Sequence, residues 1–413
     1  MGFKRLTLRL AIVLSALSAF AALPAASQEK RWNEPDLMPM VNTLGAGGQG
    51  RFDTLDSLRQ FELLQASLEK LKLMVLAQSD NELEASEGLR GILKVMGMEI
   101  TDAIYSDFKN PLFARLDTRH REVGAFNPDA EYDQTRISGE YDYKVTGNLG
   151  AVPYVSITIN GTSPTQRSTI VGYMDDAQIR DLADAEGNFT IWLSKEKPTQ
   201  PGGWIPITKE TSGFVGRQYI GDRSRQKMAT FALTAVGDTV PDTSRMPDQE
   251  IGFRINRVAN ALLVNMTWNR TLTPYALKEP NKFFEQSGQA IGGNVANTEN
   301  LYDMAHFQIA DDEALVIDFK PPQTRFWNLT SATWWHESEN YLTDPVSLTM
   351  DKVVRRKDGT VRMILAHRDP GLPNWLNSFH HNRGFMILRM VRVDHNPVPT
   401  ITKVKFASLG KFK

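Results

Sequence analysis

The fold is decided by the stretch YDYKVTGNLGAVPYVSITI at residues 141–159. Tyr141, Tyr143 and Val145 alternate with polar residues, and the same alternation returns after a segment that contains Gly and Pro. A period of two is typical of β-strands with one buried face, and Gly and Pro are typical of the turn that joins them. Two successive strands are therefore predicted here.

The strand pattern continues towards the C-terminus. Phe189, Ile191 and Leu193 alternate after the turn residues Glu186-Gly187, and Pro and Gly recur at strand-like spacing as far as Lys413. This pattern favours a mainly β protein, with antiparallel β-sandwich or jelly-roll-like lobes, over a parallel α/β sheet.

Residues 52–109 have a helical period instead. Spacings of three and four residues give two apolar faces, one formed by Phe61, Leu64, Leu68, Leu71 and Val75 and the other by Leu89, Leu93, Met96, Ile100 and Ile104. Asp53 is a predicted N-cap, and the break at Ser79-Asp80-Asn81 predicts an antiparallel α-helical hairpin. Its apolar faces must pack on each other, on the rest of the chain or on a second copy, so a homo-oligomer formed through residues 52–109 is one possible assembly.

The N-terminus resembles a secretory signal peptide. Lys4, Arg5 and Arg9 precede the apolar run Leu10–Leu23, and small residues lead to predicted cleavage near Ser27. The mature chain has no other stretch apolar enough to cross a bilayer. The predicted location is periplasmic or secreted. The predicted organisation is a signal peptide at 1–27, a flexible leader at 28–50, a helical hairpin region at 51–125, a first β-rich lobe at 126–270, an irregular or helical connection at 271–310 and a C-terminal β-rich lobe at 311–413.

Composition excludes several classes of function. The 413 residues include 47 basic and 48 acidic side chains, so no basic excess indicates a nucleic-acid partner. The chain has no cysteine, which excludes disulfides, thiol nucleophiles and Cys-ligated zinc.

The densest motif lies in the C-terminal lobe. Residues 366–376 read AHRDPGLPNWL, after an Asp358-Gly359 turn and before Gly384 and Arg389. Together with the upstream Asn127-Pro128-Asp129, this motif resembles a bacterial family known as domain of unknown function 1214. The resemblance covers about residues 126–405. It implies a β-rich sandwich fold and brings no established activity or cofactor.

His367 and Asp369 are the candidate catalytic residues. Residues i and i+2 of a strand share a face, so the two side chains could converge on one proton or one ligand. With a histidine from the next segment they could also bind a metal, which makes His367, Asp369, His380 and His381 the candidate metal ligands. The structural alternative is that Asp369 caps the turn and His367 bonds a carbonyl group.

Tryptophan is concentrated in the same lobe, where Trp327, Trp334, Trp335 and Trp375 lie within 49 residues. Exposed indoles stack on sugars or apolar ligands, whereas buried indoles fill a β core. The candidate ligand-binding residues are Trp334, Trp335, Glu337, Arg368, Asn374, Trp375 and Arg389.

Three hypotheses for function follow. The leading one is an exported protein that binds a small molecule or glycan in the cell envelope. The second is a periplasmic hydrolase or lyase that uses His367 and Asp369, with or without a metal. The third is a structural protein that assembles through its helices.

Overall fold

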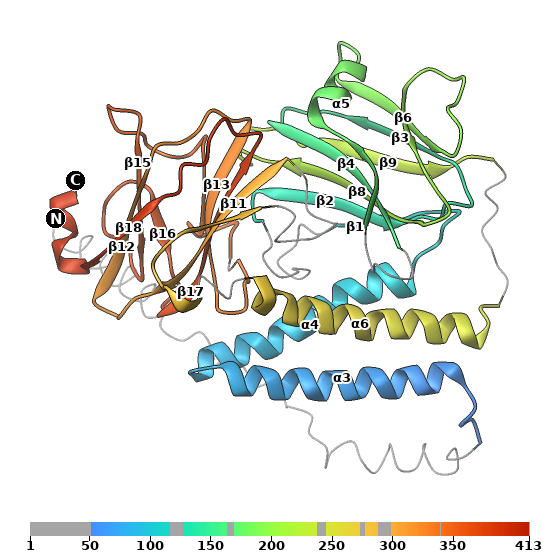
Figure 1. The fold of residues 1–413 in the computed structure, drawn as a ribbon, viewed down its shortest axis with the longest axis horizontal. Helices are drawn as coiled ribbons and strands as arrows, with labels where there is room; N and C mark the ends of the chain where they lie inside the picture. The colour runs from blue at the N-terminus through green and yellow to red at the C-terminus, as the bar shows by residue number, and fades with distance from the viewer. Residues whose placement is uncertain are drawn as a thin grey trace, which may run out of the picture. The chain divides into compact units, whose positions relative to one another are not determined.

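Strands dominate the structure, a computed structural model of the chain (Figure 1). The predicted signal peptide, its cleavage site and the leader lie outside the described residues. Among the described residues, every helix is too short or too polar to span a bilayer. The structure describes residues 51–115, 127–162, 169–237, 245–272, 277–287, 299–338 and 340–412.

The first lobe is a sandwich of two sheets. Its strands are β1 (Ala114–Arg115), β2 (Ala130–Arg136), β3 (Tyr143–Asn148), β4 (Tyr154–Gly161), β5 (Thr169–Met174), β6 (Asn188–Ser194), β7 (Gly203–Pro206), β8 (Thr211–Tyr219) and β9 (Thr230–Ala235), with helix α5 (Asp176–Leu182) after β5. Sheet A has the order β1-β2-β8-β4-β5 and sheet B the order β7-β6-β3-β9.

The predicted strands around residues 141–159 are confirmed as β3 and β4. Tyr143 and Val145 of β3, and Val155, Ile157 and Ile159 of β4, are fully buried between the two sheets. The two strands do not pair with each other, however. β3 pairs with β6 and β9, and β4 with β5 and β8. The predicted turn therefore carries the chain from one sheet to the other.

The second lobe repeats this architecture. Its elements are β10 (Phe284–Ser287), β11 (Asn300–Gln308), β12 (Glu313–Phe319), β13 (Phe326–Ala332), β14 (Ser347–Thr349), β15 (Val361–Ala366), β16 (Trp375–Asn377), β17 (Arg383–Val391), β18 (Thr400–Lys405) and the 3-10 helix η1 (Phe406–Phe412). Sheet C has the order β10-β11-β17-β13-β14 and sheet D the order β16-β15-β12-β18. The pairs β6–β7 and β15–β16 are parallel and the other pairs antiparallel, so the predicted mainly β sandwich class is confirmed.

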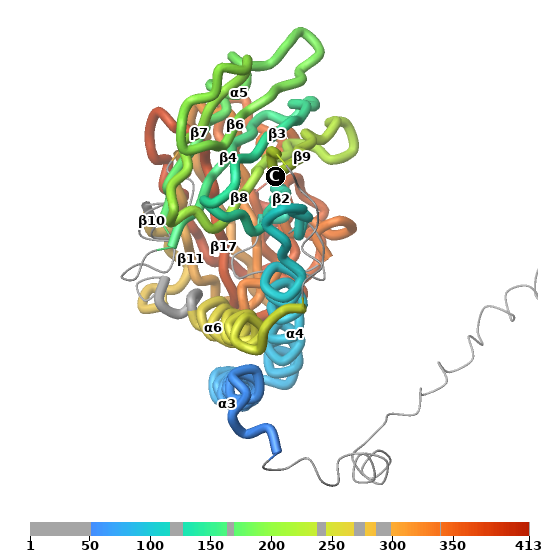
Figure 2. The backbone as a smooth tube through the Cα atoms, turned by 90° about the vertical axis from the view of Figure 1, so that its right-hand side faces the viewer, coloured from blue at the N-terminus to red at the C-terminus, as the bar shows by residue number. Residues whose placement is uncertain are grey.

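Three helices form a layer below the strands. α3 (Asp56–Gln78) and α4 (Glu82–Ile104) are the two predicted helices, separated at the predicted break. The third, α6 (Asp248–Leu272), lies where the sequence analysis places the end of a β-rich lobe, and that part of the prediction is wrong. Both α3 and α4 pack mainly on α6, and Figures 1 and 2 show α3 on the outer side of this layer.

The predicted apolar face of the second helix is correct only in part, since Met96, Ile100 and Ile104 pack against the core of the helical layer. Leu89 and Leu93 are exposed, whereas Gly88, Ile92 and Val95 are buried. Gly88 leaves room for the Trp335 indole, because a Cβ atom at this position would lie 2.6 Å from the ring. Contacts with α6 and with Trp335 of the second lobe, rather than the spacing of leucines, thus decide which face of α4 is buried. The start of α3 also differs from the prediction, since its first backbone N–H groups donate to the Asp248 carboxylate of α6.

Candidate functional site

The candidate catalytic residues His367 and Asp369 follow the end of β15. His367 Nδ1 lies 2.7 Å from the Ser378 hydroxyl, and burial lowers the pKa of the imidazole. Ser378 is itself buried. The Asp369 carboxylate accepts a hydrogen bond of 2.7 Å from the backbone N–H of Gly371, within its own turn. These contacts hold the segment in place without directing the two side chains at a common ligand.

The candidate metal ligands His380 and His381 contact different parts of the protein. The ring of His380 stacks on that of His367 with 6.2 Å between centroids. His381 Nε2 lies 3.2 Å from the Glu87 carboxylate on α4. In the part of the chain that the structure describes, no group of three or more His, Asp or Glu side chains could hold a metal ion.

The candidate tryptophans attach the helices to the second lobe. Trp334 and Trp335 are each only 8% exposed, and their indole N–H groups donate to the carbonyl oxygens of Gln78 and Glu84. Glu337 is paired with Arg90 and Lys94 of α4 at 2.6 and 3.2 Å.

The other candidate ligand-binding residues also contact the protein itself. Asn374 exchanges hydrogen bonds with the backbone of Val354, and the Trp375 indole N–H donates to the carbonyl oxygen of Ala366. The Arg368 guanidinium lies 4.3 Å from the ring centroid of Phe406. Arg389 is buried and donates a hydrogen bond of 2.8 Å to Thr330.

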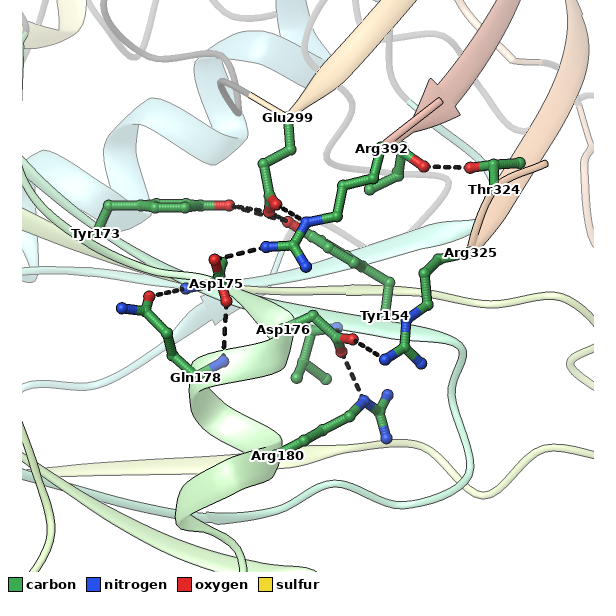
Figure 3. A network of polar contacts seen from close by, with 12 residues as sticks. Tyr154, Tyr173, Asp175, Asp176, Gln178, Arg180, Glu299, Thr324, Arg325 and Arg392 are labelled. Atoms are coloured by element: carbon green, nitrogen blue, oxygen red, sulfur yellow. Dashed lines mark hydrogen bonds and ion pairs between the residues drawn. The ribbon is translucent and has the colours of Figure 1, made fainter. Parts of the chain in front are cut away.

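A polar network joins the two lobes (Figure 3). The Tyr154 and Tyr173 hydroxyls of sheet A donate to the Glu299 carboxylate at 2.5 and 2.7 Å. Arg392, which follows β17, pairs with Glu299 and lies 2.5 Å from Asp175, the N-cap of α5. Because each of these charged groups is matched by another, the network fits a structural link better than a ligand site.

The upstream family residues lie in a second contact between the lobes. The amide of Asn328 on β13 donates at 2.7 Å to both Asn127 and Asp129. Burial raises the pKa of Asp129, and Ser347 also donates to this carboxylate. The upstream residues Asn127 and Asp129 are therefore held by polar side chains of the second lobe.

A polar cavity of about 330 Å³ lies elsewhere, between sheet A and the helices α4 and α6. Its size falls in the range of small-molecule sites. Its walls come from β2, β4, β8, α4 and α6, and they contain Glu99, Asp102, Gln134, Thr135, Arg136, Asn160, Thr162, Ser212, Gly213, Phe214, Val215, Arg257 and Asn265.

Charged groups meet in this cavity without neutralising each other at close range. In the described residues, neither Arg136 nor Arg257 forms an ion pair with a carboxylate, although both guanidiniums favour the ionised forms of Glu99 and Asp102. The Glu99 carboxylate is 8% exposed and accepts a hydrogen bond of 3.0 Å from Asn265. Burial raises the pKa of Glu99 to about 7, and burial also raises that of Asp102. Burial, with the neighbouring Arg257, lowers the pKa of Arg136 to about 10.

Sequence reasoning missed every charged residue of this cavity. Glu99 and Asp102 lie three residues apart on α4, which places them on the same side of the helix. Glu99 interrupts a buried stripe that includes Val95, Met98 and Ala103. A charged residue inside a buried stripe is the one local signal that could have indicated the site.

Together, the fold and the cavity define a class: a protein of two β-sandwich lobes with a helical layer that lines one side of a polar cavity. The family described as Protein of unknown function (DUF1214) matches residues 124–221 and 301–394, which confirms the predicted resemblance to this family. These segments span β2 to β8 and most of β11 to β17, so Arg136 and Asn160 lie inside the match, and Glu99 and Arg257 outside it.

A solved structure supports the fold. An uncharacterized protein from Burkholderia cenocepacia is 24% identical, with a TM-score of 0.77 over 89% of this chain and 99% of that chain. The VPA0106 protein from Vibrio parahaemolyticus is 10% identical, with a TM-score of 0.43 over 76% of this chain and 96% of that chain. No curated protein matches the sequence.

Proposed function

We propose that this chain is an exported protein that binds one small polar molecule in the cavity between sheet A, α4 and α6. The observation that carries this proposal is the convergence of two guanidiniums and two carboxylates on a cavity of about 330 Å³. Glu99 is buried and Asp102, Arg136 and Arg257 are partly buried. Charges that are withdrawn from water without a close opposite charge are unfavourable, and a bound ligand would supply further contacts.

The cavity suits a single small molecule rather than a polymer. Its volume is at the lower end of the range for small-molecule sites. Export is supported by the basic and apolar pattern of residues 1–27. Binding of a sugar-sized compound is therefore a narrower form of the small-molecule or glycan hypothesis, with the site moved from the tryptophans to the cavity.

A thermal-shift screen of small polar compounds tests the proposal. It compares the wild-type chain with the double variant Arg136→Ala/Arg257→Ala and with the control Arg225→Ala, which removes an exposed arginine of the same lobe. We expect at least one compound class to raise the melting temperature of the wild type and the control but not of the double variant. Compounds that stabilise all three proteins equally, or a screen without any stabilising compound, would overturn the proposal.

The hydrolase or lyase hypothesis stays a prediction, and so does assembly through the helices. Replacement of His367, which contacts Ser378, tests the hydrolase or lyase hypothesis. If His367 is catalytic, its replacement should abolish turnover without unfolding the chain. Leu73, Leu76 and Leu93 are exposed apolar residues of α3 and α4, so light scattering of variants with serine at these positions tests assembly through the helices.

A further inference from the structure

We propose that the cavity binds a monoanionic carboxylate that bears hydroxyl groups, and that binding is coupled to the uptake of one proton by Glu99. This inference rests on the proposed function and adds to it the chemical class of the ligand and the role of one side chain.

The charge of the walls favours an anion. Arg136 on β2 and Arg257 on α6 each contribute a positive charge, and Asp102 on α4 contributes a negative one. With Glu99 protonated, the formal charge of these four groups is +1, and one bound carboxylate would neutralise it. With Glu99 ionised, the four groups already balance, and an anion would meet a second carboxylate.

The groups that face Glu99 explain why this acid is the one that changes its charge. Asp102 repels its ionised form, whereas Arg257 and Arg136 favour that form and Asn265 hydrogen-bonds to it. Burial outweighs these favourable contacts and leaves the carboxyl group with a pKa of about 7. Polar but uncharged residues make up most of the rest of the wall, among them Asn160 of β4 and Ser212 of β8.

The uncharged wall favours hydroxyl groups on the ligand. Gln134, Thr135 and Thr162 add side-chain amide and hydroxyl groups to the cavity. The Oδ1 atom of Asn160 is buried and accepts no hydrogen bond from any described residue. A buried acceptor without a donor is unfavourable, and a ligand hydroxyl would satisfy it. Groups that bind an anion and groups that bind hydroxyls thus line the same cavity.

Calorimetric titration with two hexose-sized probes tests this inference. Glucuronate carries a carboxylate that is ionised throughout the range used, and glucose is its neutral counterpart. Each is titrated into wild type, Glu99→Gln and the exposed control Glu62→Gln at pH 6 and pH 8, in two buffers with different heats of ionisation. The buffer pair reports the number of protons taken up by the wild type itself, so the test does not depend on the variant alone.

We expect wild type and Glu62→Gln to bind glucuronate more tightly than glucose. Because only the protonated form of Glu99 is competent, the dissociation constant for glucuronate should rise about tenfold from pH 6 to pH 8. Proton uptake should approach one at pH 8, and Glu99→Gln should bind equally at both pH values without proton uptake.

Two results would overturn the inference while the proposed function stands. One is equal affinity for glucose and glucuronate, and the other is glucuronate binding in the wild type with no proton uptake at pH 8. If neither probe bound but another compound of the screen bound in the cavity, the ligand class would be wrong. If no polar compound bound at all, the proposed function would fail first.

Discussion

Replacement of Glu99 with glutamine isolates the effect of one buried acid on the stability of the fold. The side chain is 8% exposed and accepts its hydrogen bond from Asn265 through Oε1, an atom that glutamine keeps. The substitution therefore removes the charge while it preserves the size of the side chain and this contact.

The magnitude follows from the pKa of Glu99, which burial raises from 4.5 to about 7. Between these values the folded chain keeps a proton that the unfolded chain has lost, so the free energy of unfolding falls as the pH rises. The full difference corresponds to roughly 3 kcal/mol and is reached above pH 7. Glu99→Gln cannot ionise and escapes this loss.

Urea unfolding of wild type, Glu99→Gln and the exposed control Glu62→Gln at pH 5, 6, 7 and 8 measures the effect. The stability of Glu99→Gln relative to wild type should increase by about 2–3 kcal/mol between pH 5 and pH 8. Glu62→Gln should follow the wild type at each pH. A difference between Glu99→Gln and wild type that stays constant with pH would refute the reasoning.

Three further predictions concern stability. Burial lowers the pKa of His306 to about 4, so the unfolding free energy of the wild type should rise from pH 4 to pH 6.5. In urea titrations, His306→Leu should reduce this rise, and an unchanged slope would contradict the prediction. Trp335→Ala removes a buried indole and its bond to Glu84, and should lower the unfolding free energy by about 3–5 kcal/mol, whereas a loss below 1 kcal/mol would place the ring outside the core. Glu299→Gln removes the charge that Arg392 and two tyrosines bind, and should lower the unfolding free energy by roughly 1–3 kcal/mol. An unchanged unfolding free energy would show that this link between the lobes is dispensable.

Local periodicity predicts the strands well because the apolar side chains that face the core alternate along each strand. Val155, Ile157 and Ile159 alternate because one face of β4 lies against sheet B. Periodicity does not reveal which strands pair, so the crossing from β3 to β4 could not be foreseen. Helix α6 was missed because Asn256, Asn260 and Asn265 interrupt its apolar pattern, although Asn256 and Asn265 bond to neighbouring helices.

The unusual composition of the family motif follows from the backbone conformation of its turn. Gly371 and Asn374 both have positive φ, at 66° and 61°, and Asp369 bonds to the N–H of Gly371. Only a few residue types tolerate such a backbone, which gives the motif its unusual composition without requiring chemistry. The cavity shows the opposite case. Glu99, Arg136 and Arg257 have ordinary local surroundings in the sequence and become a candidate site only through tertiary packing.

A crystal structure of the chain soaked with glucuronate tests the central claim most directly. The account predicts the sugar acid in the cavity between sheet A, α4 and α6, with its carboxylate within hydrogen-bond distance of Arg136 or Arg257 and a hydroxyl on Oδ1 of Asn160. Glucuronate bound at another place, or a cavity that stays empty at a saturating concentration of the probe, would contradict it.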